Sequence, residues 1–154
     1  MADADIERAW RMAERSRALA DRRGDPVSSA QSDAALAVLG VTVGDTAAAA
    51  GEAARAVRSS RRQFDVFALR TVLRVLALRM LELDEPTRAA AALGWYDDLL
   101  ERCSHRHSMA AADLAERAIT TCREQLGPVD YARAAAAGAA RSISELAEDV
   151  SAVG

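Results

Sequence analysis

Apolar residues recur along this chain at helical spacing, in segments that glycine, aspartate and proline separate. The most apolar segment runs from Phe64 to Leu83, within the stretch from Arg61 to Cys103, and its apolar residues fall on nearly every side of the predicted helix. A helix of this kind is normally buried on several sides. We therefore expect the rest of the chain to pack around this stretch.

The same periodicity predicts helices before and after the apolar segment. They cover about Asp3–Arg23, Val27–Val43, Thr46–Arg61, Glu85–Cys103, a segment from after Ser108 to Leu126, and about Asp130–Ala140. Ser142 and Glu145 form a predicted capping box that begins a short last helix. Capping and helix-breaking residues separate the segments, at Gly24-Asp25-Pro26, Gly44-Asp45, Asp84-Glu85-Pro86 and Gly127-Pro128.

Composition favours a single all-α domain of seven or eight helices over residues 1–154. A chain of 154 residues suits one domain with a real core. Alanine, the best helix former, makes up about a quarter of the residues. All basic residues are arginine, which we attribute to coding bias; selection for carboxylate or phosphate binding is the alternative.

Charge and cysteine content restrict the location and the partners. A net charge of −3 argues against a dedicated nucleic-acid module, and arginines interrupt the longest apolar run, so it predicts no membrane span. The acidic N-terminal sequence MADADIERAW lacks the basic and apolar regions of a signal peptide. Two cysteines without a dense framework indicate a reducing compartment. We expect a cytoplasmic protein that contacts neither nucleic acid nor membrane directly.

Small residues recur with a period near forty residues. Three sets align: Ala9, Ala13 and Ala20; Ala49, Ala53 and Ser60; and Ala89, Leu93 and Leu100. Each unit comprises one helix, a turn marked by aspartate, and a second helix that begins with a stripe of small residues. Such stripes allow helices to lie close together, as they do in stacked repeats.

Two resemblances follow from these motifs. Leu36-Ala37, Gly44-Asp45, Ala49 and Ala56 resemble the tetratricopeptide consensus. The segments RAAAALGWYDDLLE, from Arg88 to Glu101, and AERAITTCREQLGPVDYARAAAAGAARSISELAEDV, from Ala115 to Val150, resemble the end of the helical-repeat region of bacterial LuxR-type and MalT-like ATPase regulators. The matching positions are Leu93-Gly94, Leu126-Gly127, Gly138 and Ser142 to Glu145.

The resemblance implies a tetratricopeptide-like stack of antiparallel helix pairs. The chain has no G-x-x-x-x-G-K-[ST] loop and no recognisable pair of DNA-reading helices, so only the sensor or interaction scaffold of such regulators carries over. We predict a non-enzymatic scaffold that binds a protein or peptide in a helical groove. The alternative is a small-ligand sensor with an arginine-lined pocket.

Three arginines within the apolar segment are the predicted groove residues, together with two aromatic residues on the next helix: Arg70, Arg74, Arg79, Trp95 and Tyr96. Charges in such surroundings need a carboxylate partner, a ligand or a route to water. Asp97, Asp98 and Glu101 are candidate partners, and a groove that binds an anion is the alternative. For Trp95, an interface anchor and packing against the C-terminal helices both remain open.

The first helix has no preceding partner in a stack. Ile6, Trp10 and Ala13 share one face of it, and a second subunit or the second helix has to cover that face. This face is the predicted homodimer contact.

Cys103, His105 and His107, with Cys122, are the candidates for metal binding or for a cysteine–histidine catalytic pair. Their spacing matches no standard zinc signature, and both cysteines lie on apolar stripes, where free cysteine acts as a small hydrophobic residue. We therefore predict no metal, no cofactor and no catalytic residue.

Overall fold

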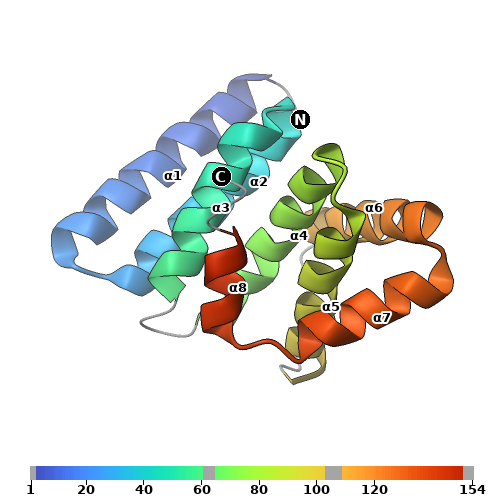
Figure 1. Ribbon diagram of the computed structural model, residues 1–154. Coiled ribbons are helices and arrows are strands. Elements are labelled where there is room, and N and C mark those ends of the chain that lie inside the picture. Colours follow the sequence, from blue (N-terminus) through green and yellow to red (C-terminus); the bar gives the residue numbers. More distant parts are fainter. Residues whose placement is uncertain (1–2, 61–64, 103–108, 151–154) are drawn as a thin grey trace.

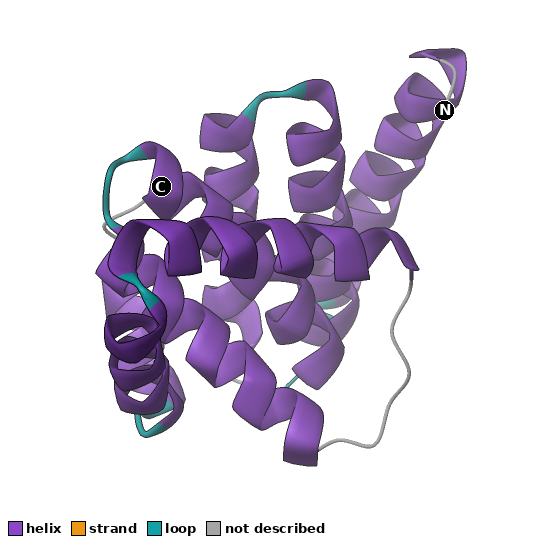
Figure 2. Cartoon of the chain, turned by 90° about the vertical axis from the view of Figure 1, so that its right-hand side faces the viewer, coloured by secondary structure: helices purple, strands orange, loops and turns teal. Residues whose placement is uncertain are grey.

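The computed structural model describes residues 3–60, 65–102 and 109–150, which form eight helices arranged as Figure 1 shows. They are α1 (Asp3–Arg23), α2 (Pro26–Val43), α3 (Thr46–Ser60), α4 (Val66–Glu82), α5 (Pro86–Arg102), α6 (Met109–Leu126), α7 (Pro128–Ala139) and α8 (Ile143–Val150). Figure 2 shows only helices and short connections in this part of the chain. The all-α prediction is confirmed, whereas the tetratricopeptide-like stacking stays a prediction.

The helix boundaries differ from the expected ones by one or two residues, for reasons of local chemistry. Proline occupies the first turn of α2 and of α7, so these helices begin at Pro26 and Pro128, slightly before the predicted starts. The most apolar helix begins at Val66 instead of Phe64, because the carboxylate of Asp65 caps it by accepting hydrogen bonds from Phe67 N and Ala68 N.

Acidic residues begin successive helices at positions 25, 45, 65 and 85, twenty residues apart. The backbone carbonyl of each accepts the first helical hydrogen bond, and the carboxylates of Asp25, Asp45 and Asp65 also accept backbone amides of the first turn. Gly24, Gly44 and Asp84 precede three of these positions with left-handed φ angles of 64°, 85° and 60°. One local signal therefore ends one helix and begins the next.

The apolar helix α4 lies at the centre of the fold, as the sequence predicts. It packs against α2, α3, α5 and α6. The side chains that fill the core from this helix are nearly inaccessible to solvent: Leu69, Val72, Leu73, Val75, Leu76 and Met80. This arrangement fixes α3 and α5 on one central helix.

Helix α7 crosses α5 at backbone contact and packs on it far more extensively than on α6. A Cβ atom built at Gly94 would lie 1.9 Å from the carbonyl oxygen of Ala135, and one built at Gly138 would lie 1.9 Å from that of Ala91. Only glycine at both positions permits this separation. The crossing places the connection from α7 to α8 beside α5.

Candidate functional site

The three arginines of α4 occupy different surroundings. Arg70 and Arg74 are buried, and the Arg74 guanidinium carbon lies 5.3 Å from the centroid of the Tyr96 ring, a cation–π geometry. Burial lowers the pKa of Arg74 and the charge of Arg70 lowers it further, while Tyr96 acts in the opposite direction. Arg79 forms an ion pair with Glu82 of its own helix, at 3.2 Å. The structure thus brings Arg74 and Tyr96 together and directs Arg79 to a separate partner.

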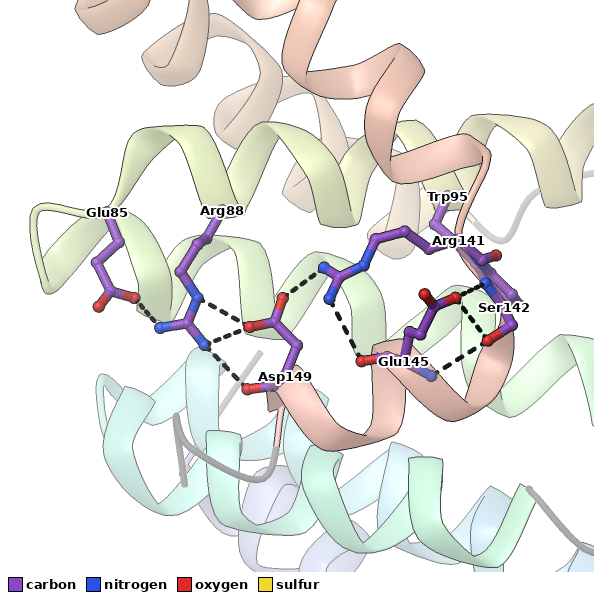
Figure 3. A network of polar contacts seen from close by, with 7 residues as sticks. All are labelled: Glu85, Arg88, Trp95, Arg141, Ser142, Glu145 and Asp149. Atoms are coloured by element: carbon purple, nitrogen blue, oxygen red, sulfur yellow. Dashed lines mark hydrogen bonds and ion pairs between the residues drawn. The ribbon is translucent and has the colours of Figure 1, made fainter.

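Trp95 is buried, with 6% of its surface exposed, and lies against the connection that follows α7. Its indole Nε1–H donates a hydrogen bond of 2.8 Å to the backbone carbonyl of Arg141 (Figure 3). Of the two interpretations drawn from the sequence, this contact corresponds to packing against the C-terminal helices. Trp95 fixes the point from which α8 starts.

The short helix α8 bridges α3 and α5, which both pack on α4 (Figure 1). Asp149, near its C-terminal end, lies between two arginines (Figure 3). Arg88 of α5 donates to the Asp149 carboxylate from Nε at 3.1 Å and from Nη2 at 2.9 Å. Arg141 donates to the other carboxylate oxygen at 2.7 Å. We call Arg88, Arg141 and Asp149 the α8 clasp.

Arg88 also binds the end of the helix itself, because its Nη2 donates to the backbone carbonyl of Asp149 at 2.9 Å. The last carbonyls of a helix have no partner within the helix and carry partial negative charge, which a cation stabilises. Glu85 forms an ion pair with Nη1 of the same guanidinium and holds it in place. Arg88 thus contacts both a carboxylate and a helix C-terminus.

At the other end of α8, the predicted capping box is confirmed. Ser142 N donates to the Glu145 carboxylate at 2.7 Å, and Glu145 N donates to Ser142 Oγ at 3.3 Å. The side-chain and backbone hydrogen bonds from Ser142 lower the pKa of Glu145. Local sequence therefore starts α8, whereas its C-terminal end depends on an arginine from another helix.

The pKa of Asp149 reflects the clasp. Burial tends to raise it, but the hydrogen bonds and charges of Arg141 and Arg88 outweigh burial and hold it below its usual range. The carboxylate stays ionised, so these contacts are charge-assisted hydrogen bonds, the stronger kind.

A second polar site lies between α1, α2 and α3, where side chains line an open pocket of about 530 Å³. Its lining combines three arginines, two aspartates and two serines: Arg17, Asp21, Ser29, Asp33, Arg55, Arg58 and Ser59. We call it the polar cleft. Serine hydroxyls and arginines at one opening suit a small anion, and the aspartates suit a donor group on the same ligand.

Asp33 is the most enclosed group of the polar cleft, with 3% of its side chain exposed. Its Oδ1 lies 3.4 Å from Nη1 of Arg17 and 3.7 Å from Nε of Arg55, and both arginines also pair with Glu52. Burial raises the pKa of Asp33 in spite of the charges of Arg55 and Arg17. This cluster was not predicted from the sequence, where its one signal is a lone aspartate among the apolar residues of the second helix.

The predicted dimer face lies on a sparsely buried helix. Ile6, Trp10 and Ala13 are half-buried, and Ala20 is the one fully buried apolar residue in the described part of α1. Because α1 packs on α2, the second helix covers part of this face. The homodimer stays a prediction.

Of the metal and catalytic candidates, Cys103, His105 and His107 lie outside the described residues. Cys122 is buried, and burial raises the pKa of its thiol to about 11, so it stays protonated and unreactive at neutral pH. Within residues 3–60, 65–102 and 109–150, no three metal-ligating side chains come together.

None of the helices in the described ranges combines the length and the apolar run that crossing a membrane requires. Comparison with known protein families, with curated proteins and with solved structures finds no match of any of the three kinds.

Proposed function

We propose that this protein is a non-enzymatic interaction scaffold that binds a protein or peptide segment, in the manner expected from its resemblance to the repeat region of bacterial regulators. One observation carries the proposal: the helical array already holds a short helix, α8, across α3 and α5. The surface that receives α8 offers an arginine for a carboxylate and for a helix end. Such a surface suits helical segments of other chains.

The length of α8 strengthens this argument. Isolated helices shorter than about 12 residues are marginal in water, and α8 has 8 residues. Its order therefore depends on its docking contacts, as the order of a bound peptide does. The rest of the array supplies those contacts from α3 and α5, and the α7 crossing and the α4 core hold α5 in place.

A peptide-display experiment on the full chain tests the proposal. A library of helical peptides of about 15 residues is panned against the immobilised protein, and bound peptides are mapped by hydrogen exchange. We expect enrichment of peptides that protect amides of α3 and α5, with dissociation constants in the micromolar range. Recovery of no peptide that binds tighter than about 1 mM overturns the proposal.

A small-ligand sensor is the second candidate, and the polar cleft is the observation that favours it. Arg58 lines the cleft, is exposed, and forms no ion pair among the described residues. Inorganic phosphate and citrate serve as probes in thermal unfolding. A sensor predicts stabilisation that Arg58→Gln removes and that Arg133→Gln, a change of an exposed arginine on α7, leaves intact; equal responses of both variants exclude a specific site.

A further inference from the structure

We infer that α8 is a displaceable internal occupant of its docking face, and that a partner's acidic amphipathic helix takes the same place, with a carboxylate at the position of Asp149. This inference rests on the proposed scaffold function and names the partner's chemistry and its regulation. The docking face consists of Arg88 of α5 together with the adjoining side of α3, and Trp95 of α5 holds the connection that leads into α8.

The first step concerns recognition. Arg88 places two hydrogen bonds on one carboxylate oxygen and a third on the carbonyl of the same residue. This set requires an acidic side chain in the last turn of a helix, because only the last four carbonyls lack a partner within the helix. A helix without an acid in this turn leaves Arg88 with Glu85 as its one acidic partner among the described residues. The geometry therefore selects for acidic helix ends.

The second step concerns release. About a fifth of the Asp149 side chain and about a third of each arginine side chain remain accessible, so water competes for the clasp. A helix of 8 residues loses its order once these contacts break. Short, partly solvated elements open before the core does. The face under α8 is therefore available without unfolding of the helices around α4.

The third step concerns the occupant. In the sequence of α8, ISELAEDV, the apolar residues recur every three or four positions, which is helical spacing, and acidic residues stand between them. Its docking partner Arg88 and its own flanking Arg141 supply the complementary charge. A competing helix gains the same charge pairing and, when longer than α8, adds helical order of its own. Displacement then depends on the partner's concentration relative to the tethered α8.

Hydrogen exchange in the full chain tests whether the clasp controls release. Asp149→Arg places a third positive charge beside Arg88 and Arg141. Glu148→Arg is the matched control, because it makes the same change of charge one position earlier, at an exposed residue without an ion pair among those described. We expect the amides of α8 to exchange at least tenfold faster in Asp149→Arg than in Glu148→Arg. Equal exchange rates in the two variants contradict the claim that the α8 clasp controls the release of α8.

A charge-swap variant separates release from loss of folding. Arg88→Glu combined with Asp149→Arg restores an opposite-charge pair at the same place, next to Glu85 and Arg141, and we expect α8 to exchange more slowly than in Asp149→Arg alone. Exchange in the double variant as fast as in Asp149→Arg alone contradicts a direct Arg88–Asp149 contact. The amides of α4 report global stability in each variant, and their protection has to remain.

Binding in trans tests the partner chemistry. A labelled synthetic peptide with the sequence of residues 141–154 is titrated against the full-length wild type, Asp149→Arg and Glu148→Arg. We expect at least tenfold tighter binding to Asp149→Arg than to the other two proteins, and loss of binding when position 149 of the peptide carries Arg. Faster exchange of α8 without peptide binding contradicts the docking function, whereas peptide binding that is equal in all three proteins contradicts only the regulation by α8.

Discussion

In two parts of this molecule a carboxylate lies between two arginines, and the two sites differ in burial and distance. Between α1, α2 and α3, Asp33 has 3% of its side chain exposed, and its arginines lie at 3.4 and 3.7 Å. Between α5 and α8, Asp149 has 21% exposed, with an arginine at 2.7 Å. The pKa is raised by burial at Asp33 and lowered by the arginines at Asp149. The distance to the arginines and the access of solvent, more than the residue types, decide whether the pKa of the carboxyl group is raised or lowered.

The helices that carry these sites also meet in different ways. A Cβ atom at Gly40 of α2 would lie 2.9 Å from the Cβ of Ala49 of α3, which is a contact between methyl groups. A Cβ at Gly94 or at Gly138 would strike backbone carbonyls between α5 and α7. A small shift between the helices relieves the contact at 2.9 Å, whereas an overlap at 1.9 Å with a backbone carbonyl requires α5 and α7 to move apart.

The largest effect should come from Gly94→Ala. Because the added Cβ forces α5 and α7 apart, we expect the free energy of unfolding to fall by about 3 kcal/mol. Gly51→Ala is the control, since a Cβ there meets nothing within 4 Å; it should raise the free energy of unfolding by about 0.5 to 1 kcal/mol. Urea denaturation measures both. A similar change in the two variants would show that the backbone crossing is wrong.

Removal of the two carboxylates should differ in effect. Asp33→Ala removes a buried carboxylate and leaves the partly exposed Arg17 and Arg55 paired with Glu52, and we expect a loss of about 2 kcal/mol. Asp149→Ala breaks a partly solvated clasp, with an expected loss of about 1 kcal/mol. Urea denaturation of both variants checks the order. A larger loss of unfolding free energy in Asp149→Ala than in Asp33→Ala would contradict the predicted order.

Gly40→Ala tests the adjustable contact, with an expected loss of about 1 kcal/mol. The methyl group it meets belongs to Ala49, so Ala49→Gly should remove the clash although it lowers stability by itself. A double-mutant cycle measures the coupling: the loss caused by Gly40→Ala should become smaller in the Ala49→Gly background, where only the Cα and N of residue 49 remain close, at 3.2 and 3.3 Å. Additive losses would mean that the two positions do not touch.

The pH dependence of stability should give the smallest and sharpest difference. Because the pKa of Asp33 is higher in the folded state than in the unfolded state, the protonated carboxyl contributes stability that is fully present at pH values below 3.8. This contribution is lost as pH rises through the folded pKa. The lowered pKa of Asp149 stabilises the fold above 3.8, and this contribution is lost as pH falls through the folded pKa.

Wild type is compared with Asp33→Asn and with Asp149→Asn from about pH 3 to about pH 6 by urea denaturation. Relative to its variant, wild type should lose stability with rising pH in the first comparison and gain it in the second. Slopes of the same sign would contradict the assignment of burial as the dominant influence on Asp33.

Much of the fold could be predicted because its signals act over a few residues. Asp25, within the predicted break, begins α2 by accepting amides two and three positions later, and Ser142 and Glu145 form the predicted capping box of α8. The buried central helix followed from its apolar residues alone. The helix ends differ from the predicted ones by one or two residues where proline or a capping carboxylate moves the boundary, and the tetratricopeptide-like stacking stays a prediction.

The candidate sites could be predicted less well, because their members are remote in the chain. Arg88 and Asp149 are 61 positions apart, and the arginines that reach Asp33 come from the helices before and after its own. The sequence singled out the arginines of α4 because charge in an apolar helix is conspicuous. It offered no such contrast for Arg88, which looks like an ordinary exposed residue at the start of a helix.

By itself the sequence determined which segments are helical, where they begin to within one or two residues, and which one is most buried, since capping and periodicity act within one or two turns. Only the tertiary structure decided that Gly94 and Gly138 touch the opposite backbones, that α7 therefore lies on α5, and that α8 reaches Arg88. Each of these depends on the distance between helices, which no local pattern encodes. The physical reason is that a side chain finds a remote partner only after packing has set that distance.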